Sequence, residues 1–340
     1  MPKTPFFAEH RPAIRELIQR VGGGHNEDLV ADLIENSLKV LKDVEDRGDV
    51  KVMQTAMREM RYAYRLFAPY AERRKVSIFG SARTKPDKKE YQHAAEFARQ
   101  MVEAGFMVIT GAGGGIMQAG HEGAGVEHSF GCNIRLPWEQ NANPVISEDE
   151  KLVTFKYFFT RKLMFIRQSD AIALFPGGYG TMDEGYEALT LMQTGKAQLM
   201  PLVLIDKPGG TYWKSWDKTV REHLLRNELI SPDDLFLYQI TDSPEQAVKW
   251  ITRFYRNYHS MRFAKGRLVI RLKNVPTVSA LEALTEDFAD IIGSGSIDRV
   301  EASEDEREEG DVQELPRIAF DFDRRQYGRL RQMIDVVNAW

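Results

Sequence analysis

The sequence contains a single cysteine, Cys132, so it cannot form an intramolecular disulfide or a cysteine-rich zinc site. One cysteine suits the reducing cytoplasm, where we expect the protein to work. No uninterrupted apolar run reaches the length of a signal peptide or a membrane span, which predicts no membrane association. Positive charge is not in excess either. Lys and Arg total 46 against 50 Asp and Glu, and a formal net charge of −4 argues against nucleic acid as a partner.

Short apolar runs rich in β-branched residues recur through the middle of the chain and end at turn residues. Helix-like segments separate these runs, which occupy residues 75–80, 106–115, 130–136, 171–178 and 200–206. Nearly continuous apolar strands that alternate with helices are typical of a parallel, doubly wound α/β sheet covered on both faces. We therefore predict a Rossmann-like nucleotide-binding domain over residues 75–262, with its ligand at the carboxyl ends of the strands.

Two further parts flank this domain. Apolar residues at helical spacing, interrupted at residues 46–50, predict two helices within an N-terminal helical extension over residues 1–74. The basic stretch 259–267 is interpreted as a linker. Residues 263–340, which include the end of this stretch, are predicted to form a small C-terminal α+β module of βαββα type. The acidic run 301–311 within that module is expected to be a solvated loop.

Three glycine-rich turns follow three of the predicted strands, with the sequences GSAR, TGAGGGIM and PGGYGTMDE. Glycine lets backbone N–H groups approach a phosphate closely, and a helix that begins directly afterwards adds the positive end of its dipole. Any one of these turns could equally be a tight connection with no ligand, but three together favour a phosphate site. The candidate phosphate-binding residues are Gly113, Gly114, Gly115, Gly177, Gly178, Gly180 and Thr181, the last of which adds a hydroxyl donor.

Two better-known phosphate motifs do not fit these loops. No glycine-rich loop supplies the Gly-Lys-Ser/Thr of a Walker motif, which argues against ATP hydrolysis. GAGGGIMQAG resembles a dinucleotide fingerprint, but it follows the second strand of its unit. The next strand ends in NIRL, without an acidic residue for a ribose hydroxyl.

Two carboxylates follow the third loop. Glu184 and Glu187 share one face of a predicted helix, and Glu184 lies in its first turn. Breaking an N-glycosidic bond develops positive charge on the ribose, which a fixed carboxylate can stabilise while it activates water. These acids could instead only favour the helix N-terminus electrostatically. On the preceding helix-like segment 154–171, Arg161 could bind a phosphate or ribose, or pair with a structural carboxylate.

PGGYGTMDE matches the PGGxGTxxE motif of the LONELY GUY (LOG) family at every specified position, and the RK of TRKLMF matches the arginine–lysine pair on its preceding helix. The sequence therefore resembles this family, long mislabelled as lysine decarboxylases, over about residues 75–258. The resemblance implies a Rossmann-like fold and a homodimer or larger assembly. It also implies hydrolysis of nucleoside 5′-monophosphates to free base and ribose 5-phosphate. No cofactor or metal is expected.

The resemblance also implies roles for single residues. Arg161 and Glu184 become the catalytic pair, and Gly177, Gly178, Gly180 and Thr181 become the phosphate cradle. The ribose and base side is assigned to Ser81, Arg83, Met117, Lys162 and Glu187. Trp138, Tyr179 and Met117 are candidates for packing against the base. The second loop is closer to the longer bacterial form than to the TGGGxxGLM of short plant proteins, which favours nucleotides such as AMP over cytokinin nucleotides.

Other functions remain open on residue chemistry. A lysine decarboxylase would need a pyridoxal phosphate lysine and a site for its aldimine, so we discount that activity. A nucleotide- or cofactor-binding carrier or sensor could use the same loops without turnover, although a pure binder has no need of Arg161 with Glu184. Binding of single-stranded nucleic acid would need a basic groove with exposed aromatics. The TFKYFFTRK segment supplies both residue types, but its apolar density favours core packing.

Overall fold

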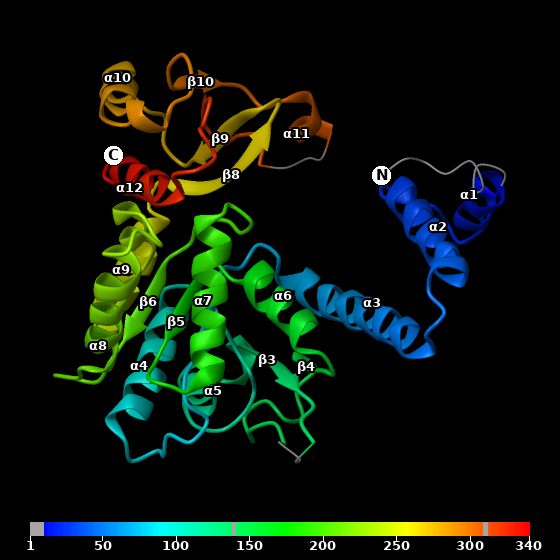
Figure 1. Cartoon of the computed structure of the whole chain (residues 1–340), viewed down its shortest axis with the longest axis horizontal. Helices are drawn as coiled ribbons and strands as arrows, with labels where there is room; N and C mark the ends of the chain where they lie inside the picture. The colour runs from blue at the N-terminus through cyan, green and yellow to red at the C-terminus, as the bar shows by residue number, and fades with distance from the viewer. Residues whose placement is uncertain (1–9, 138–140, 309–311) are drawn as a thin grey trace. The chain divides into compact units, whose positions relative to one another are not determined.

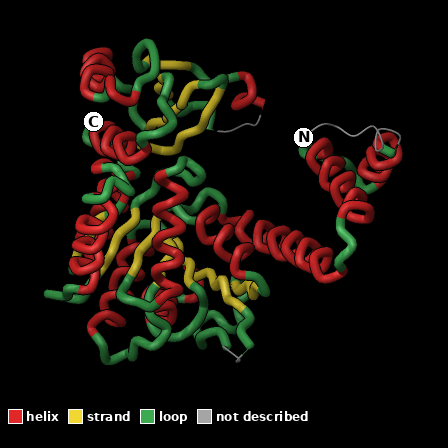
Figure 2. Tube along the Cα trace, in the orientation of Figure 1, coloured by secondary structure: helices red, strands yellow, loops and turns green. Residues whose placement is uncertain are grey.

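The computed structural model describes residues 10–137, 141–308 and 312–340 and divides into two compact units, Met1–Tyr62 and Ala63–Trp340. The first unit is helical (Figure 2), with α1 (Arg11–Arg20), α2 (Glu27–Asp43) and most of α3 (Arg47–Phe67). The sequence predicted α2 and α3 but not α1. The first unit has a small core formed by Ile14, Ile18 and Ala31, and Ile34 packs against it.

The second unit is built on a seven-stranded parallel sheet in the order β4-β3-β2-β1-β5-β6-β7. Its strands are β1 (Lys75–Phe79), β2 (Met107–Thr110), β3 (Ser129–Ile134), β4 (Leu152–Phe155), β5 (Ala171–Leu174), β6 (Leu202–Ile205) and β7 (Gln239–Thr241). Four of these strands, β3 to β6, are labelled in Figure 1. The helices between them are α4 (Lys89–Glu103), α5 (Ile116–Ala124), α6 (Phe158–Gln168), α7 (Tyr179–Gln193), α8 (Tyr212–Thr219) and α9 (Pro244–Phe254). The protein is thus a Rossmann-like, doubly wound α/β protein, as the sequence predicted, and its strand order reverses between β1 and β5.

Burial explains which strands the sequence revealed. Every residue of β1, β2, β3, β5 and β6 is buried, so each is a nearly continuous apolar run. The two edge strands were not predicted, because β4 alternates buried with more exposed positions and β7 has only three partly exposed residues. Among the described residues, none of the helices combines the length and the apolar character that crossing a membrane requires.

A second, antiparallel sheet follows in the order β10-β11-β9-β8. Its elements are β8 (Tyr258–Ala264), β9 (Arg267–Leu272), α10 (Val278–Asp287), β10 (Asp298–Val300), α11 (Glu304–Glu308), β11 (Arg317–Phe320) and α12 (Tyr327–Val337). The predicted linker at residues 259–267 is wrong, because β8 pairs with β9 over most of this stretch, with Met261 opposite Ile270. As an edge strand with only two buried positions, β8 lacks the apolar run that identifies a strand.

Buried side-chain amides join this C-terminal module to the parallel-sheet domain. Asn338 Oδ1 accepts hydrogen bonds from the backbone N–H groups of Asn257 and Tyr258, both at 2.9 Å. Asn257 Nδ2 in turn donates to the Val337 carbonyl at 3.1 Å, and both asparagines are fully buried. The domain boundary that we predicted at residue 262 falls inside β8. We keep the division into an N-terminal extension, a central domain and a C-terminal module as a proposal.

Residues 309–311 of the acidic run lie outside the described residues, and residues 301–308 are more than the solvated loop that we expected. Glu306, on α11, has its Oε1 atom 2.6 Å from Arg271 Nη2 and 3.3 Å from Arg317 Nε, and all three side chains are buried. Burial would raise the pKa of Glu306, but the Ser303 backbone N–H and the two guanidinium groups lower it to about 2. Two arginines on neighbouring strands thus share one buried carboxylate.

Replacing Glu306 by alanine is expected to lower the free energy of unfolding by about 3–5 kcal/mol, because two buried guanidinium groups lose their shared partner. Urea unfolding at pH 7 measures this loss. The exposed Glu304→Ala on the same helix is the control, expected within about 0.5 kcal/mol of the wild type. Because folding lowers the pKa, the stabilisation is present above pH 4.5 and is lost as the pH falls toward 2. Equal losses in the two variants would contradict the buried triad.

Candidate active site

The candidate site lies where the strand order of the parallel sheet reverses. β1 pairs on one side with β2 and on the other with β5, although β5 begins about a hundred residues later in the chain. The carboxyl ends of these three strands therefore meet. Each is followed by one of the glycine-rich loops.

Backbone hydrogen bonds through Ser81 join the three loops. Its N–H donates to the Pro176 carbonyl at 3.1 Å, and its own carbonyl accepts from the Ile116 N–H at 3.1 Å. Gly115 has φ +62°, and a Cβ there would lie 2.2 Å from the Ser81 carbonyl oxygen. A Cβ at Gly177 would lie 2.1 Å from Thr181 Oγ1. Larger residues at these two positions would push the loops apart.

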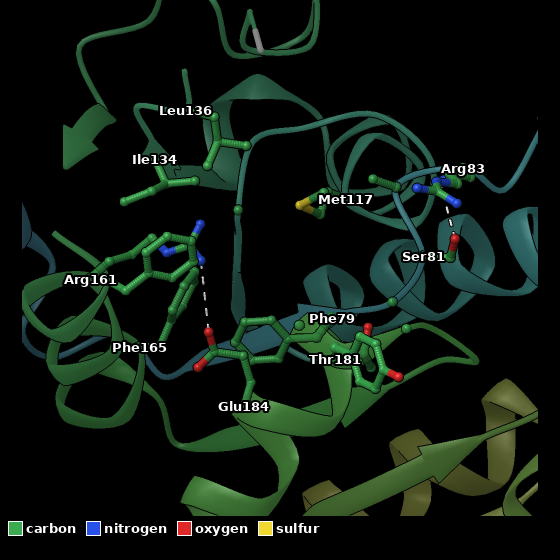
Figure 3. A pocket seen from close by; sticks show the side chains of 17 residues that line it. Phe79, Ser81, Arg83, Met117, Ile134, Leu136, Arg161, Phe165, Thr181 and Glu184 are labelled. Atoms are coloured by element: carbon green, nitrogen blue, oxygen red, sulfur yellow. Dashed lines mark hydrogen bonds and ion pairs between the residues drawn. The ribbon is translucent and has the colours of Figure 1, made fainter. Parts of the chain in front are cut away.

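The loops and α6 surround a cavity of about 730 Å³ (Figure 3). Eight of the predicted site residues line it: Ser81, Arg83, Met117, Arg161, Gly178, Gly180, Thr181 and Glu184. Tyr179, a candidate base-packing residue, also lines it and is almost fully exposed. The apolar part of the wall is formed by Phe79, Ile134, Leu136, Phe158 and Phe165. Trp138 lies outside the described residues.

The other predicted site residues do not line the cavity. Gly113, Gly114, Gly115 and Gly177 are in the loops but do not line the cavity, and two of their carbonyls accept hydrogen bonds from other parts of the chain. The Gly113 carbonyl accepts from Asn143 Nδ2 at 3.0 Å, and the Gly177 carbonyl accepts from the Tyr212 hydroxyl at 2.5 Å. These four glycines shape the loops, whereas Gly178 and Gly180 face the cavity.

The first turn of α7 points backbone donors at the cavity. Gly178 is the N-cap of this 15-residue helix, and its carbonyl accepts from the N–H groups of Thr181 and Met182. No acceptor among the described residues bonds the N–H groups of Gly178, Tyr179 or Gly180. Unpaired N–H groups at a helix N-terminus, combined with the helix dipole, form an anion-binding site.

Arg161 and Glu184 lie next to each other in the cavity wall, with Arg161 Nη2 3.9 Å from Glu184 Oε1 (Figure 3). Both side chains are largely buried, and the guanidinium also lies over the Phe158 ring. Burial raises the pKa of Glu184, and the positive charges of Lys162 and Arg161 oppose that shift. Burial likewise lowers the pKa of Arg161 from its very high ordinary value. The Arg161 Nε atom is buried without a hydrogen-bond partner among the described residues.

Lys162 supports Glu184 from behind the cavity. Its Nζ atom lies 3.2 Å from Glu184 Oε2, 2.5 Å from Glu187 Oε2 and 3.0 Å from Asp183 Oδ2. Burial acts to lower the pKa of Lys162, but the three carboxylates together raise it. Lys162 and Glu187, which we predicted on the ribose and base side, therefore bind each other and do not line the cavity.

Sequence reasoning missed a buried polar network that holds the second loop. His121 Nε2 lies 3.1 Å from Thr110 Oγ1, and its Nδ1 atom is hydrogen-bonded to the Asn143 side chain. Burial lowers the pKa of His121, which keeps the ring neutral. No local motif links these residues, so only the structure brings them together. Within the described ranges, no group of three or more His, Cys, Asp or Glu residues is arranged to hold a metal ion.

Comparison with known proteins agrees with this arrangement. Residues 111–251 match the protein family described as "Possible lysine decarboxylase". A probable cytokinin riboside 5′-monophosphate phosphoribohydrolase of Oryza sativa subsp. japonica is 29% identical over 187 residues, which are 52% of this chain and 69% of that protein. A cytokinin riboside 5′-monophosphate phosphoribohydrolase of Arabidopsis thaliana is 31% identical over 129 residues, 36% of this chain and 58% of that protein.

Among solved structures, the molybdenum cofactor carrier protein of Chlamydomonas reinhardtii aligns with 53% of this chain and 97% of its own. The sequence identity is 18% and the TM-score is 0.37. A likeness at this level supports no conclusion about ligand or activity.

Replacing Glu184 by glutamine is expected to raise the thermal unfolding temperature at pH 7. The rise should be about 2–4 °C for each kcal/mol by which the free energy of unfolding increases. The reason is that folding raises the pKa of this carboxyl, so its anion costs stability above the ordinary pKa of 4.5. As the pH falls through the raised pKa, the wild-type carboxyl becomes protonated and the difference should vanish. Glu187→Gln, which relieves no buried charge, serves as the control. A large loss of stability in Glu184→Gln at pH 7 would contradict this account.

Proposed function

Because this chain belongs to the LOG family, we propose that it hydrolyses the N-glycosidic bond of nucleoside 5′-monophosphates and releases free base and ribose 5-phosphate. One observation carries the proposal. One cavity is lined both by the α7 N-terminus, whose first N–H groups have no acceptor in the described part of the chain, and by the buried Arg161 and Glu184 pair. The first feature suits a phosphate, and the second suits a reacting ribose.

Phosphate recognition is assigned to the first turn of α7. The N–H groups of Gly178, Tyr179 and Gly180 bind the 5′-phosphate oxygens, supported by the helix dipole. Thr181, which is buried beneath this turn, adds its hydroxyl group. The net charge of the chain offers no broad cationic field, so this local site supplies the attraction for the phosphate.

Bond cleavage is assigned to Glu184 and Arg161. As the bond from C1′ to the base nitrogen breaks, positive charge develops on the ribose ring, and the Glu184 carboxylate stabilises it. A water molecule orientated by the same carboxylate adds its oxygen to C1′, and its proton balances the charge on the departing base. Arg161 orients the ribose or the phosphate through guanidinium donors that Glu184 leaves free.

The substrate is proposed to be an ordinary nucleotide such as AMP. The second loop, TGAGGGIM, departs from the pattern of the short plant proteins. Met117 and the apolar side chains of the wall provide a surface for a purine ring. Cytokinin nucleotides, on which the similar plant proteins are named to act, belong in the same substrate panel.

The test is release of free base and ribose 5-phosphate from a panel of nucleoside monophosphates. Glu184→Gln and Arg161→Ala are each expected to lower kcat by about 10²-fold or more, because each removes transition-state stabilisation. Arg167→Ala changes an exposed arginine on the same helix and should behave as wild type. If no nucleotide is cleaved although nucleotides bind, hydrolysis is excluded, and a nucleotide- or cofactor-binding carrier or sensor becomes the better assignment.

We also propose that the protein is a homodimer or a larger homo-oligomer. Exposed aromatic side chains occur at the cavity wall and next to it. Tyr179, which is 97% exposed, and the half-exposed Phe158 line the cavity, and Phe159, the next residue on α6, is also about half exposed. Such a patch on a folded domain marks an interaction surface. A second copy of the chain is the occupant that the family resemblance implies.

Replacing Phe159 by glutamate is expected to convert the wild-type oligomer to a monomer, because a charge would be buried without a partner at the contact. Light scattering coupled to gel filtration measures the mass. Leu229→Glu introduces the same charge at another exposed apolar position and should leave the mass unchanged. A monomeric wild type, or an unchanged mass in Phe159→Glu, argues against this surface.

A further inference from the structure

A tyrosine outside the predicted site holds the third glycine-rich loop from behind. The hydroxyl group of Tyr212 donates a hydrogen bond to the Gly177 carbonyl oxygen at 2.5 Å. Tyr212 is the first residue of α8, which follows β6, and β6 pairs with β5, the strand that leads into this loop. Tyr212 does not line the cavity, so any influence on a ligand must pass through the loop.

The geometry of the peptide bond explains what this contact does. In a trans peptide the carbonyl oxygen and the following N–H point in opposite directions, and the described residues contain no cis peptide bond. Because Tyr212 binds the Gly177 carbonyl on one side, the Gly178 N–H must point to the other. Gly178 lines the cavity, and its N–H has no acceptor among the described residues. Tyr212 thus fixes the direction of one of the donors assigned to the phosphate.

The hydroxyl is itself fixed by the turn that precedes α8. The buried carboxylate of Asp206 accepts hydrogen bonds from the Tyr212 N–H at 2.8 Å and from the Lys207 N–H at 2.9 Å. A Cβ at Gly210 would lie 2.1 Å from this carboxylate, so the turn closes tightly around it. The Tyr212 ring also packs edge-on against the buried Trp213, at 4.9 Å between ring centroids.

A glycine pair needs such support. Gly177 and Gly178 have no side chains to limit rotation of the peptide between them, and a Cβ at Gly178 would meet no atom within 4 Å. Without the Tyr212 hydroxyl, this peptide could turn its N–H away from the cavity. The energy gained on phosphate binding would then be reduced by the cost of orientating the donor.

We propose that Tyr212 is a positioning residue for phosphate recognition, which acts by orientating the Gly177–Gly178 peptide so that the Gly178 N–H faces the bound phosphate. This inference rests on the proposed function only in taking the α7 N-terminus as the phosphate site. It does not require that the nucleotide is cleaved. It predicts a defect that depends on the phosphate group of the ligand and not on its base or ribose.

The test compares Tyr212→Phe with the wild type in calorimetric binding of AMP, ribose 5-phosphate and adenosine. The expected result is an increase of about tenfold in Kd for AMP and for ribose 5-phosphate, the loss that one well-placed hydrogen bond explains. The Kd for adenosine should stay within about twofold. If AMP is turned over, KM should rise while kcat at saturation stays within about twofold.

Tyr238→Phe is the matched control. The Tyr238 hydroxyl also donates to α8, to Asp217 Oδ1 at 2.5 Å, but it does not touch the loop. This variant should bind all three ligands as wild type does. A general loss of folded protein in Tyr212→Phe would weaken AMP and adenosine binding alike, so the ratio of the two affinities separates positioning from misfolding.

The outcomes decide the two proposals separately. Unchanged affinity for both phosphate ligands in Tyr212→Phe, or an equal loss for AMP and adenosine, overturns the positioning role. Failure of the wild type to bind either phosphate ligand overturns it as well. A selective loss for the phosphate ligands in a protein that cleaves no nucleotide upholds the role of Tyr212 and removes hydrolysis alone.

Discussion

The backbone of Ser81 joins the three glycine-rich loops, and the shape of the cavity depends on that junction. Its N–H bonds the loop after β5 and its carbonyl bonds the start of α5, so segments from three parts of the chain form one continuous backbone surface. The approach is so close that Gly115 leaves no room for a Cβ. Glycine therefore has two separate uses here. At Gly115 and Gly177 it permits packing between loops, and at Gly178 and Gly180 it exposes backbone donors to the cavity.

In the same cavity wall, the buried Glu184 carboxylate lies near two cations, Arg161 and Lys162, which have different surroundings. Burial disfavours the charged form of Glu184, whereas Lys162 and Arg161 favour it. Lys162 is engaged by three carboxylates, so it has little left to offer a ligand. Arg161 stands farther from Glu184 and keeps donors that face the cavity. In the proposed reaction, Lys162 would thus help to keep Glu184 ionised, while Arg161 would be available to contact the substrate.

The C-terminal module is fixed to the parallel-sheet domain by buried polar contacts. The Asn338 side chain accepts a hydrogen bond from the Asn257 backbone N–H, and the Asn257 side chain donates one to the carbonyl of Val337. Both side chains are fully buried, where an unpaired amide would be costly. α12 packs against α7, the helix that carries Glu184, and the Tyr327 ring lies against Gly195 just beyond the end of α7. α7 therefore connects the module with the cavity.

The sequence by itself determined that the domain is a parallel, Rossmann-like α/β fold and where its buried strands lie along the chain, because burial on both faces leaves a continuous apolar run. It also placed Thr181 and Glu184 at the start of one helix, since the spacing within PGGYGTMDE is local. Only the tertiary structure decided which glycines face the cavity, that Lys162 binds Glu187, and that Tyr212 supports the third loop. It also decided that β8 is a strand and that Glu306 is buried between two arginines. These features depend on which strands are neighbours. Neighbouring strands can lie far apart in the chain, and no local pattern of residues records their pairing.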